Sequence, residues 1–133
     1  MPQRKPPQEQ INYVLSLFKS DQIQQTLDLI DTLSKDYPDD SLLFNIRGAC
    51  YAGLGQLDIA VQNYKKALSI KPDYAKAHYN LGNALKDEGK FDEAIASYRQ
   101  AIKLKPNFAD AYSNLGLVLN GQKKCDKAIA SLQ

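Results

Sequence analysis

A fixed interval of 34 residues is the feature of this sequence that most limits how it can fold. Gly48, Gly82 and Gly116 stand at this interval, and further columns keep the same step. Those columns are Ala60, Ala94 and Ala128; Ala67 and Ala101; Tyr64 and Tyr98; and Pro38, Pro72 and Pro106. Repeats of such length are built from one supersecondary unit, which buries its apolar face by stacking on its neighbours. The sequence therefore predicts a repeat array.

Each repeat has two apolar stripes with the spacing of a helix face. Phe44, Gly48 and Tyr51 form the first stripe of one repeat, and Ala60 and Tyr64 belong to its second. Residues three or four positions apart lie on one side of a helix, so each stripe predicts an amphipathic helix. Each repeat is thus expected to be a pair of helices.

Turn residues separate the predicted helices. Gly55 and Gly89 follow the first stripe of their repeats, where a residue past a helix end often takes a left-handed conformation that glycine adopts without strain. Asp58 and Asp92 follow, and a carboxylate in the first turn of a helix interacts favourably with its free amides. We interpret the two aspartates as caps. The proline column marks the step to the next repeat, because proline cannot continue a helix interior.

Two runs carry a family resemblance: Phe44…Gly48-x-x-Tyr51…Ala60…Tyr64…Ala67…Pro72 and His78-x-x-Leu81-Gly82…Ala94…Tyr98…Ala101…Pro106. They resemble tetratricopeptide (TPR) repeats. The resemblance implies an all-α fold, a right-handed TPR superhelix (α-solenoid) of antiparallel helix pairs.

The repeat columns give the expected organisation of the chain. We predict a flexible N-terminal tail at 1–6, a degenerate N-terminal TPR at 7–40, TPRs at 41–74 and 75–108, and a partial C-terminal TPR at 109–133. The first repeat is degenerate because Val14, Thr26 and Leu33 stand where the family has glycine or alanine. The last opens with Tyr112-x-x-Leu115-Gly116, and the sequence stops before its second helix would finish.

The resemblance also implies a binding surface, because the first helix of each TPR faces the concave groove of the solenoid. The peptide-binding residues that it predicts are Asn45, Lys76, Tyr79, Asn80, Asn83, Asp87, Asp110, Asn114, Leu117 and Asn120. Other positions carried over to this face are Leu42, Ile46, Ala49, Ala52, Lys86 and Ser113, with Ile11, Asn12, Leu15 and Phe18 from the degenerate repeat.

Asparagine recurs on the predicted inner face although it is a mediocre helix former. Its carboxamide both donates and accepts, so it can pair with the backbone of an extended peptide. Asn80 and Asn114 share one motif position, which resembles the asparagine ladder lining the solenoid of O-linked N-acetylglucosamine transferases. The alternative is that these asparagines only solvate an exposed helix face.

Chaperone-binding TPR proteins use a carboxylate clamp of two lysines, two asparagines and an arginine. Counted from the second repeat, the clamp positions hold Asn45, Ala49, Asn80, Asp110 and Asn114, where Asp110 would repel a terminal carboxylate. Counted from the first, they hold Ile11, Leu15, Ile46, Lys76 and Asn80. We do not expect this chain to bind chaperone C-terminal tails.

Composition excludes several other classes of function. The 17 basic and 15 acidic residues are interspersed, and a net charge of +2 gives no strong field for nucleic acid or anionic lipid. The N-terminal residues contain no apolar stretch typical of a signal or membrane span, so we expect a soluble, cytoplasmic protein. Cys50 and Cys125 lack the spacing of a zinc site or disulfide framework, and we expect reduced structural thiols and no metal or cofactor.

No set of residues indicates catalysis. An active site gathers a nucleophile, an acid or base with a shifted pKa, or a metal in one pocket. The lone histidine, His78, stands in an aromatic column, which favours packing over acid-base chemistry. We therefore expect that the protein is not an enzyme.

Three functions follow from this interpretation. The first is a protein- or peptide-binding scaffold that holds an extended segment or a partner helix in its concave groove. The second is the N-terminal substrate-recognition solenoid of a larger enzyme, such as a glycosyltransferase or sulfotransferase. The third is a structural module that self-associates through an uncovered C-terminal face formed by Leu115, Leu119, Ile129 and Leu132.

Overall fold

The computed structural model describes residues 5–131, where the chain forms helices joined by short loops. The helices are α1 (Gln8–Lys19), α2 (Ile23–Asp36), α3 (Ser41–Gly53), α4 (Leu57–Ile70), α5 (Ala75–Asp87), α6 (Phe91–Leu104) and α7 (Ala109–Ser131). Most of the predicted flexible tail, residues 1–4, lies outside the described residues. Pro6, assigned to that tail, is buried.

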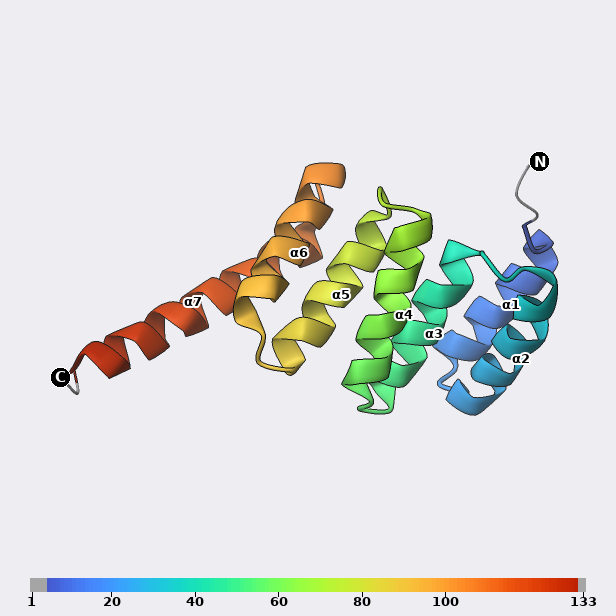
Figure 1. Cartoon of the computed structure of the whole chain (residues 1–133), viewed down its shortest axis with the longest axis horizontal. Helices are drawn as coiled ribbons and strands as arrows, with labels where there is room; N and C mark the ends of the chain where they lie inside the picture. The colour runs from blue at the N-terminus through green and yellow to red at the C-terminus, as the bar shows by residue number, and fades with distance from the viewer. Residues whose placement is uncertain (1–4, 132–133) are drawn as a thin grey trace. The chain divides into compact units, whose positions relative to one another are not determined.

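The chain divides into two compact units, Met1–Pro72 and Asp73–Gln133, called the first and second unit below. In the first unit, α1 pairs with α2, α3 pairs with α4, and α2 packs on α3. In the second unit, α5 pairs with α6, and α7 packs on α6 (Figure 1). Each predicted repeat up to residue 108 is therefore a helical hairpin.

The hairpin turns use a left-handed residue, as predicted. Gly55 has a φ of 77° and Gly89 a φ of 80°, and each follows the first helix of its hairpin. In the first hairpin the same column holds Asp21, whose φ is 62°. Aspartate is one of the few residues with a side chain that tolerate this conformation. The degenerate repeat therefore keeps the turn of the others without its glycine.

Glycine is required where the helices of a hairpin cross. A Cβ atom added to Gly48 would lie 2.6 Å from the Tyr64 ring, and one added to Gly82 would lie 2.8 Å from the Tyr98 ring. Both distances are too short for van der Waals contact. The small residue on the first helix thus makes room for the tyrosine on the second.

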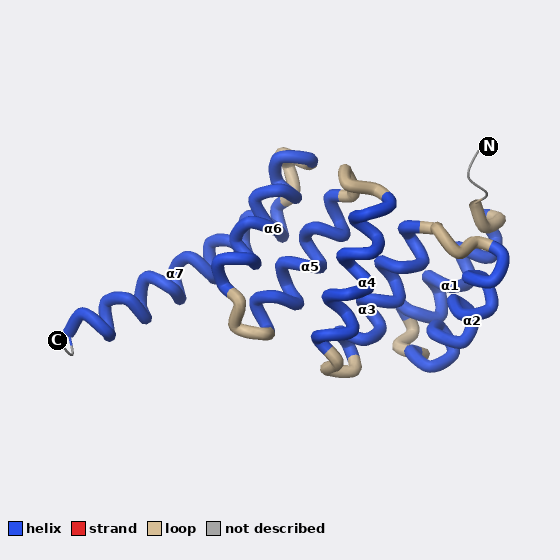
Figure 2. The backbone as a smooth tube through the Cα atoms, in the orientation of Figure 1, coloured by secondary structure: helices blue, strands red, loops and turns tan. Residues whose placement is uncertain are grey.

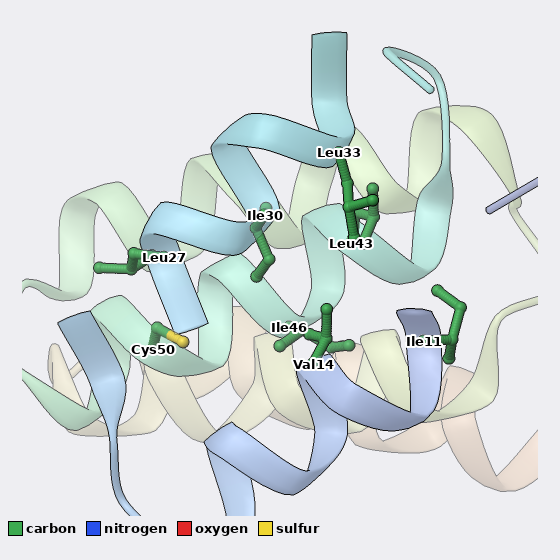
Figure 3. Close-up of a cluster of buried hydrophobic side chains, with 8 residues drawn as sticks. All are labelled: Ile11, Val14, Leu27, Ile30, Leu33, Leu43, Ile46 and Cys50. Carbon is green, nitrogen blue, oxygen red and sulfur yellow. The ribbon is translucent and has the colours of Figure 1, made fainter. Parts of the chain in front are cut away.

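The first hairpin fills its interior differently. Val14 occupies the glycine column and Ile30 the tyrosine column, and both side chains are fully buried. They belong to one apolar cluster (Figure 3) that also contains Ile11, Leu27, Leu33, Leu43, Ile46 and Cys50. This cluster joins α1, α2 and α3 into the core of the first unit.

The last repeat differs from the expected pair of helices, because no separate second helix forms within the described residues. α7 continues unbroken from Ala109 to Ser131, as Figure 2 shows. Residue 123 is the column of Asp21, Gly55 and Gly89, but here it is lysine. A left-handed conformation costs a lysine about 1–2 kcal/mol, so the signal that ends the earlier helices is missing.

Candidate functional site

The predicted binding residues of the last two repeats lie on α5 and α7, which pack within the second unit. Lys76, Asp87, Asp110 and Asn120 are exposed, while Tyr79, Asn80, Asn83 and Asn114 are half-buried. Leu117 is 65% exposed, which is unusual for a leucine on a packed helix. The second unit thus places polar, aromatic and apolar side chains on an accessible surface.

Asn83, Asn114 and Tyr79 on this surface form a hydrogen-bonded network with the buried Tyr98, called the amide network below. Asn83 Oδ1 accepts from the Tyr98 hydroxyl at 2.5 Å and from Asn114 Nδ2 at 2.8 Å. Asn114 Nδ2 also donates to the Tyr79 hydroxyl at 3.2 Å. These bonds hold both carboxamide groups in place through the Oδ1 atom of Asn83 and the Nδ2 group of Asn114. The Nδ2 group of Asn83 and the Oδ1 atom of Asn114 have no bond of this kind to the described residues.

Tyr98 anchors the amide network from α6. Burial raises the pKa of its hydroxyl, and nearby Tyr79 and Asp87 raise it further. The hydroxyl is therefore protonated at neutral pH and remains a hydrogen-bond donor to Asn83. The repeat pattern gave Tyr98 only as a member of a column and did not predict this role, because the hydroxyl partner lies on another helix.

An aromatic cluster borders the amide network. The Tyr79 ring centroid lies 4.9 Å from that of Phe108 and 6.1 Å from that of Tyr98. Lys76 Nζ lies 5.1 Å from the Tyr79 centroid, and Lys105 Nζ lies 4.8 Å from the Phe108 centroid. Such distances allow cation–π attraction. Phe108 was absent from the predicted site, although its 34-residue step from Tyr74 was a usable signal.

The first unit does not match the expected inner face. Asn45 is only 6% exposed, and Ile46 and Ile11 are buried in the apolar cluster of that unit. The expectation that these three side chains are exposed is wrong. The physical reason is that apolar side chains of α1 and α2 pack against α3, so this face of α3 belongs to a core. Leu15, Phe18 and Leu42 also pack against it.

A small apolar cavity lies at the end of the second unit. Its volume is about 200 Å³, and it is lined by Lys86, Phe91, Leu117, Val118, Gly121, Gln122 and Cys125. Gln122 Nε2 donates to Asp92 Oδ1 at 2.9 Å, which links α7 to the start of α6.

The two cysteines lie in different environments. Cys50 is fully buried, and burial raises the pKa of its thiol to about 11, against a smaller lowering by Arg47. It is therefore an unreactive packing residue. Cys125 is exposed and lines the cavity, so the structure does not give it the packing role that was predicted.

Residues 5–131 contain neither a cluster of metal-ligating side chains nor a helix that could span a membrane. No group of three or more histidine, cysteine, aspartate or glutamate side chains in this range is arranged to hold a metal ion. None of the helices described has both the length and the apolar character that crossing a membrane requires.

Comparison with known proteins identifies the repeat. The family model described as TPR repeat matches residues 48–87 and 82–123, which together make up more than half of the chain. The peroxisomal targeting signal receptor of Candida glabrata is 33% identical over 75 residues, or 56% of this chain. That stretch is 13% of the receptor, so the chain spans only a small part of this relative.

Solved structures share the fold. An O-GlcNAc transferase of Thermobaculum terrenum matches 84% of this chain and 22% of its own, with a TM-score of 0.81 and 24% identity. The first TPR of Spaghetti, solved with an HSP90 peptide, matches 84% of this chain and 89% of its own, with a TM-score of 0.80 and 21% identity. At such identities the likeness shows the fold alone, and it confirms the predicted all-α superhelical class.

Proposed function

The chain belongs to the TPR repeat family, and from this premise we propose that it is a non-catalytic scaffold that binds a protein or peptide partner. We place the contact with an extended segment of that partner on the amide network and the side chains around it. Lys76, Asn80, Asp87, Asp110, Leu117 and Asn120 are proposed as flanking contacts. Asn45 is not included, because its side chain is buried.

The unused halves of two fixed amides support this proposal. Asn83 has a free Nδ2 donor and Asn114 a free Oδ1 acceptor, while their other halves are held by each other and by tyrosines. An extended peptide offers one carbonyl and one N–H at each residue, so it can satisfy both groups whatever its side chains are. Because the amides are already ordered, binding costs little side-chain entropy.

The charges around the amide network favour no single sign in the ligand. Lys76 and Lys105 lie over the aromatic rings, whereas Asp87 and Asp110 are exposed carboxylates on α5 and α7. Asp110 stands at a clamp position and would oppose a terminal carboxylate. We therefore propose internal, extended segments as ligands, and expect chaperone tail peptides to bind weakly.

An immobilised library of random peptides, probed with the full chain, tests the proposal. Peptides selected in this way should bind the Asn114→Ala variant about tenfold more weakly, because two ordered hydrogen-bonding groups are lost. Fluorescence anisotropy measures the affinity. Asn63→Ala is the matched control, since Asn63 lies on α4 and its amide donates to the backbone oxygen of Ile59. Equal affinity of both variants would contradict a role for the amide network.

A recognition solenoid in a longer enzyme is the second candidate. It is favoured by the likeness to an O-GlcNAc transferase of which this chain matches only 22%. In that case the same surface would select a protein substrate for a catalytic domain elsewhere. Sequencing the transcript that encodes the chain distinguishes the two, because the second candidate requires a catalytic domain in the same reading frame.

A further inference from the structure

One face of α7 is uncovered where the matching faces of α3 and α5 are packed. A Cβ added to Gly116 would meet nothing within 4 Å, whereas the same addition at Gly48 or Gly82 meets a tyrosine ring. Tyr112 is 51% exposed and Leu119 39% exposed. The residues at the position of Tyr112 in α3 and α5, Phe44 and His78, are half-buried. At the position of Leu119, Tyr51 is half-buried and Leu85 is buried. α7 therefore has the surface of a first hairpin helix without a second helix upon it.

The end of the same helix has the residues of the missing second helix. Ala128 stands in the column of the fully buried Ala60 and Ala94. Ile129 stands in the column of Val61 and Ile95, which are each 8% exposed, but it is itself 58% exposed. Leu132, outside the described residues, occupies the tyrosine column. The sequence of this segment thus fits the face that α7 leaves open.

Residue 123 decides whether the segment can reach that face. In a continuous helix the two halves of α7 point away from each other along one axis, so the hairpin needs a turn between them. The turn position is left-handed in all three hairpins, at Asp21, Gly55 and Gly89. Lys123 disfavours this turn, yet Asp21 shows that the turn forms in this chain without glycine.

We propose that residues 109–131 exchange between two states, a continuous helix and a fourth hairpin in which residues 125–131 fold back over Gly116 with Lys123 as the left-handed turn residue. Closure would bury the exposed faces of Tyr112, Leu119 and Ile129, which favours it. The left-handed lysine and the helical hydrogen bonds lost at the turn oppose it. Gly121, Gln122 and Cys125 line the cavity beside Phe91, so closure would also dismantle that cavity.

A distance measurement along α7 separates the two states. Spin labels at Ser113→Cys and Ser131→Cys, in a Cys125→Ser background, leave only the buried Cys50 as a native thiol. In a continuous helix the labelled backbones lie about 27 Å apart, at about 1.5 Å per residue. In the hairpin they lie on adjacent helices whose axes are about 8–10 Å apart. Electron paramagnetic resonance of the full chain measures both populations.

Two glycine substitutions isolate the role of the turn. Lys123→Gly should raise the ratio of short to long distances about tenfold, because it removes the cost of the left-handed lysine. Lys124→Gly is the matched control, since it weakens the helix equally. Its column holds Gln22, Gln56 and Lys90, whose φ values are near −90°, so glycine gains no advantage there. Circular dichroism checks that both variants remain folded.

Filling the open face provides a second test. Adding Gly116→Leu to Lys123→Gly should restore the long distance, because the leucine occupies the space that the closing helix needs. The proposal is overturned if Lys123→Gly and Lys124→Gly give the same single long distance. It is also overturned if the short distance disappears on dilution with unlabelled chain, since the segment would then be packing on a second copy.

Discussion

The first hairpin and the two that follow it differ in the side chains that pack where the two helices of a hairpin cross. In α3–α4 and α5–α6, a glycine on the first helix faces a tyrosine on the second. In α1–α2, these columns hold Val14 and Ile30, which are both fully buried. A larger residue on one side is thus matched by a smaller one on the other. Packing at this position therefore depends on the combined volume of the two facing side chains and not on particular residue types, as expected for close-packed interiors.

The two pairs of packed side chains also differ in the polar interactions that they provide. Val14 and Ile30 contribute only apolar contact to a cluster that extends into α3. Tyrosine also has a hydroxyl, and at Tyr98 this hydroxyl orders Asn83. The glycine and tyrosine pair therefore links the core of the second unit to its polar surface, whereas the first unit has no such link at Ile30.

Truncating Ile30 should have the largest effect on stability. Ile30→Ala removes a fully buried side chain from the core of the first unit and leaves a cavity, so the free energy of unfolding should fall by about 2–5 kcal/mol. Urea denaturation followed by circular dichroism measures it. Ile59→Ala, at a position that is 38% exposed, should change stability by about 0.5 kcal/mol or less. If both variants lost a similar free energy of unfolding, burial where the helices cross would not explain the effect at Ile30.

Enlarging the glycine should have the next largest effect. Gly82→Leu forces a side chain against Tyr98, and the overpacking should lower the free energy of unfolding by about 1–3 kcal/mol. Gly116→Leu, in the same column but with open space around it, should instead be neutral or stabilising by up to about 1 kcal/mol, because leucine is the better helix former. Thermal and urea unfolding of the two variants measure the difference, and the comparison fails if both are equally destabilised.

Removing one hydroxyl should have the smallest effect. Tyr98→Phe deletes the donor to Asn83, and the free energy of unfolding should fall by about 1 kcal/mol. Tyr64→Phe is the control from the matching column, because Tyr64 makes no side-chain hydrogen bond to the described residues. Its stability should be close to that of the parent chain. A loss at Tyr64→Phe as large as at Tyr98→Phe would mean that the amide network adds nothing to the second unit.

Much of the fold could be predicted because the repeat is encoded locally. The hairpins over residues 41–108 follow from columns at a fixed interval, and Gly55 and Gly89 take the left-handed turns expected of them. The first hairpin was also predicted, although its glycine and alanine positions are substituted, because its length and its proline are kept.

The candidate site could be predicted only in part. The repeat register places Tyr79, Asn83 and Asn114 on first helices, but it contains no information on which amide bonds to which hydroxyl. The contributions of Tyr98 and Phe108 come from packing between helices that are distant in sequence. The burial of Asn45 likewise depends on the first unit having its own apolar core around α3.

The repeat length, the helices of each hairpin and the small residues where these helices cross can all be read from the amino-acid sequence. These features depend on the spacing and size of side chains within a single repeat. The accessible inward positions, the order of the amides and the continuation of α7 through Lys123 become visible in the packed structure alone. Those outcomes depend on neighbouring helices, because burial, hydrogen-bond partners and the balance between helix and hairpin arise from contacts that no local pattern contains.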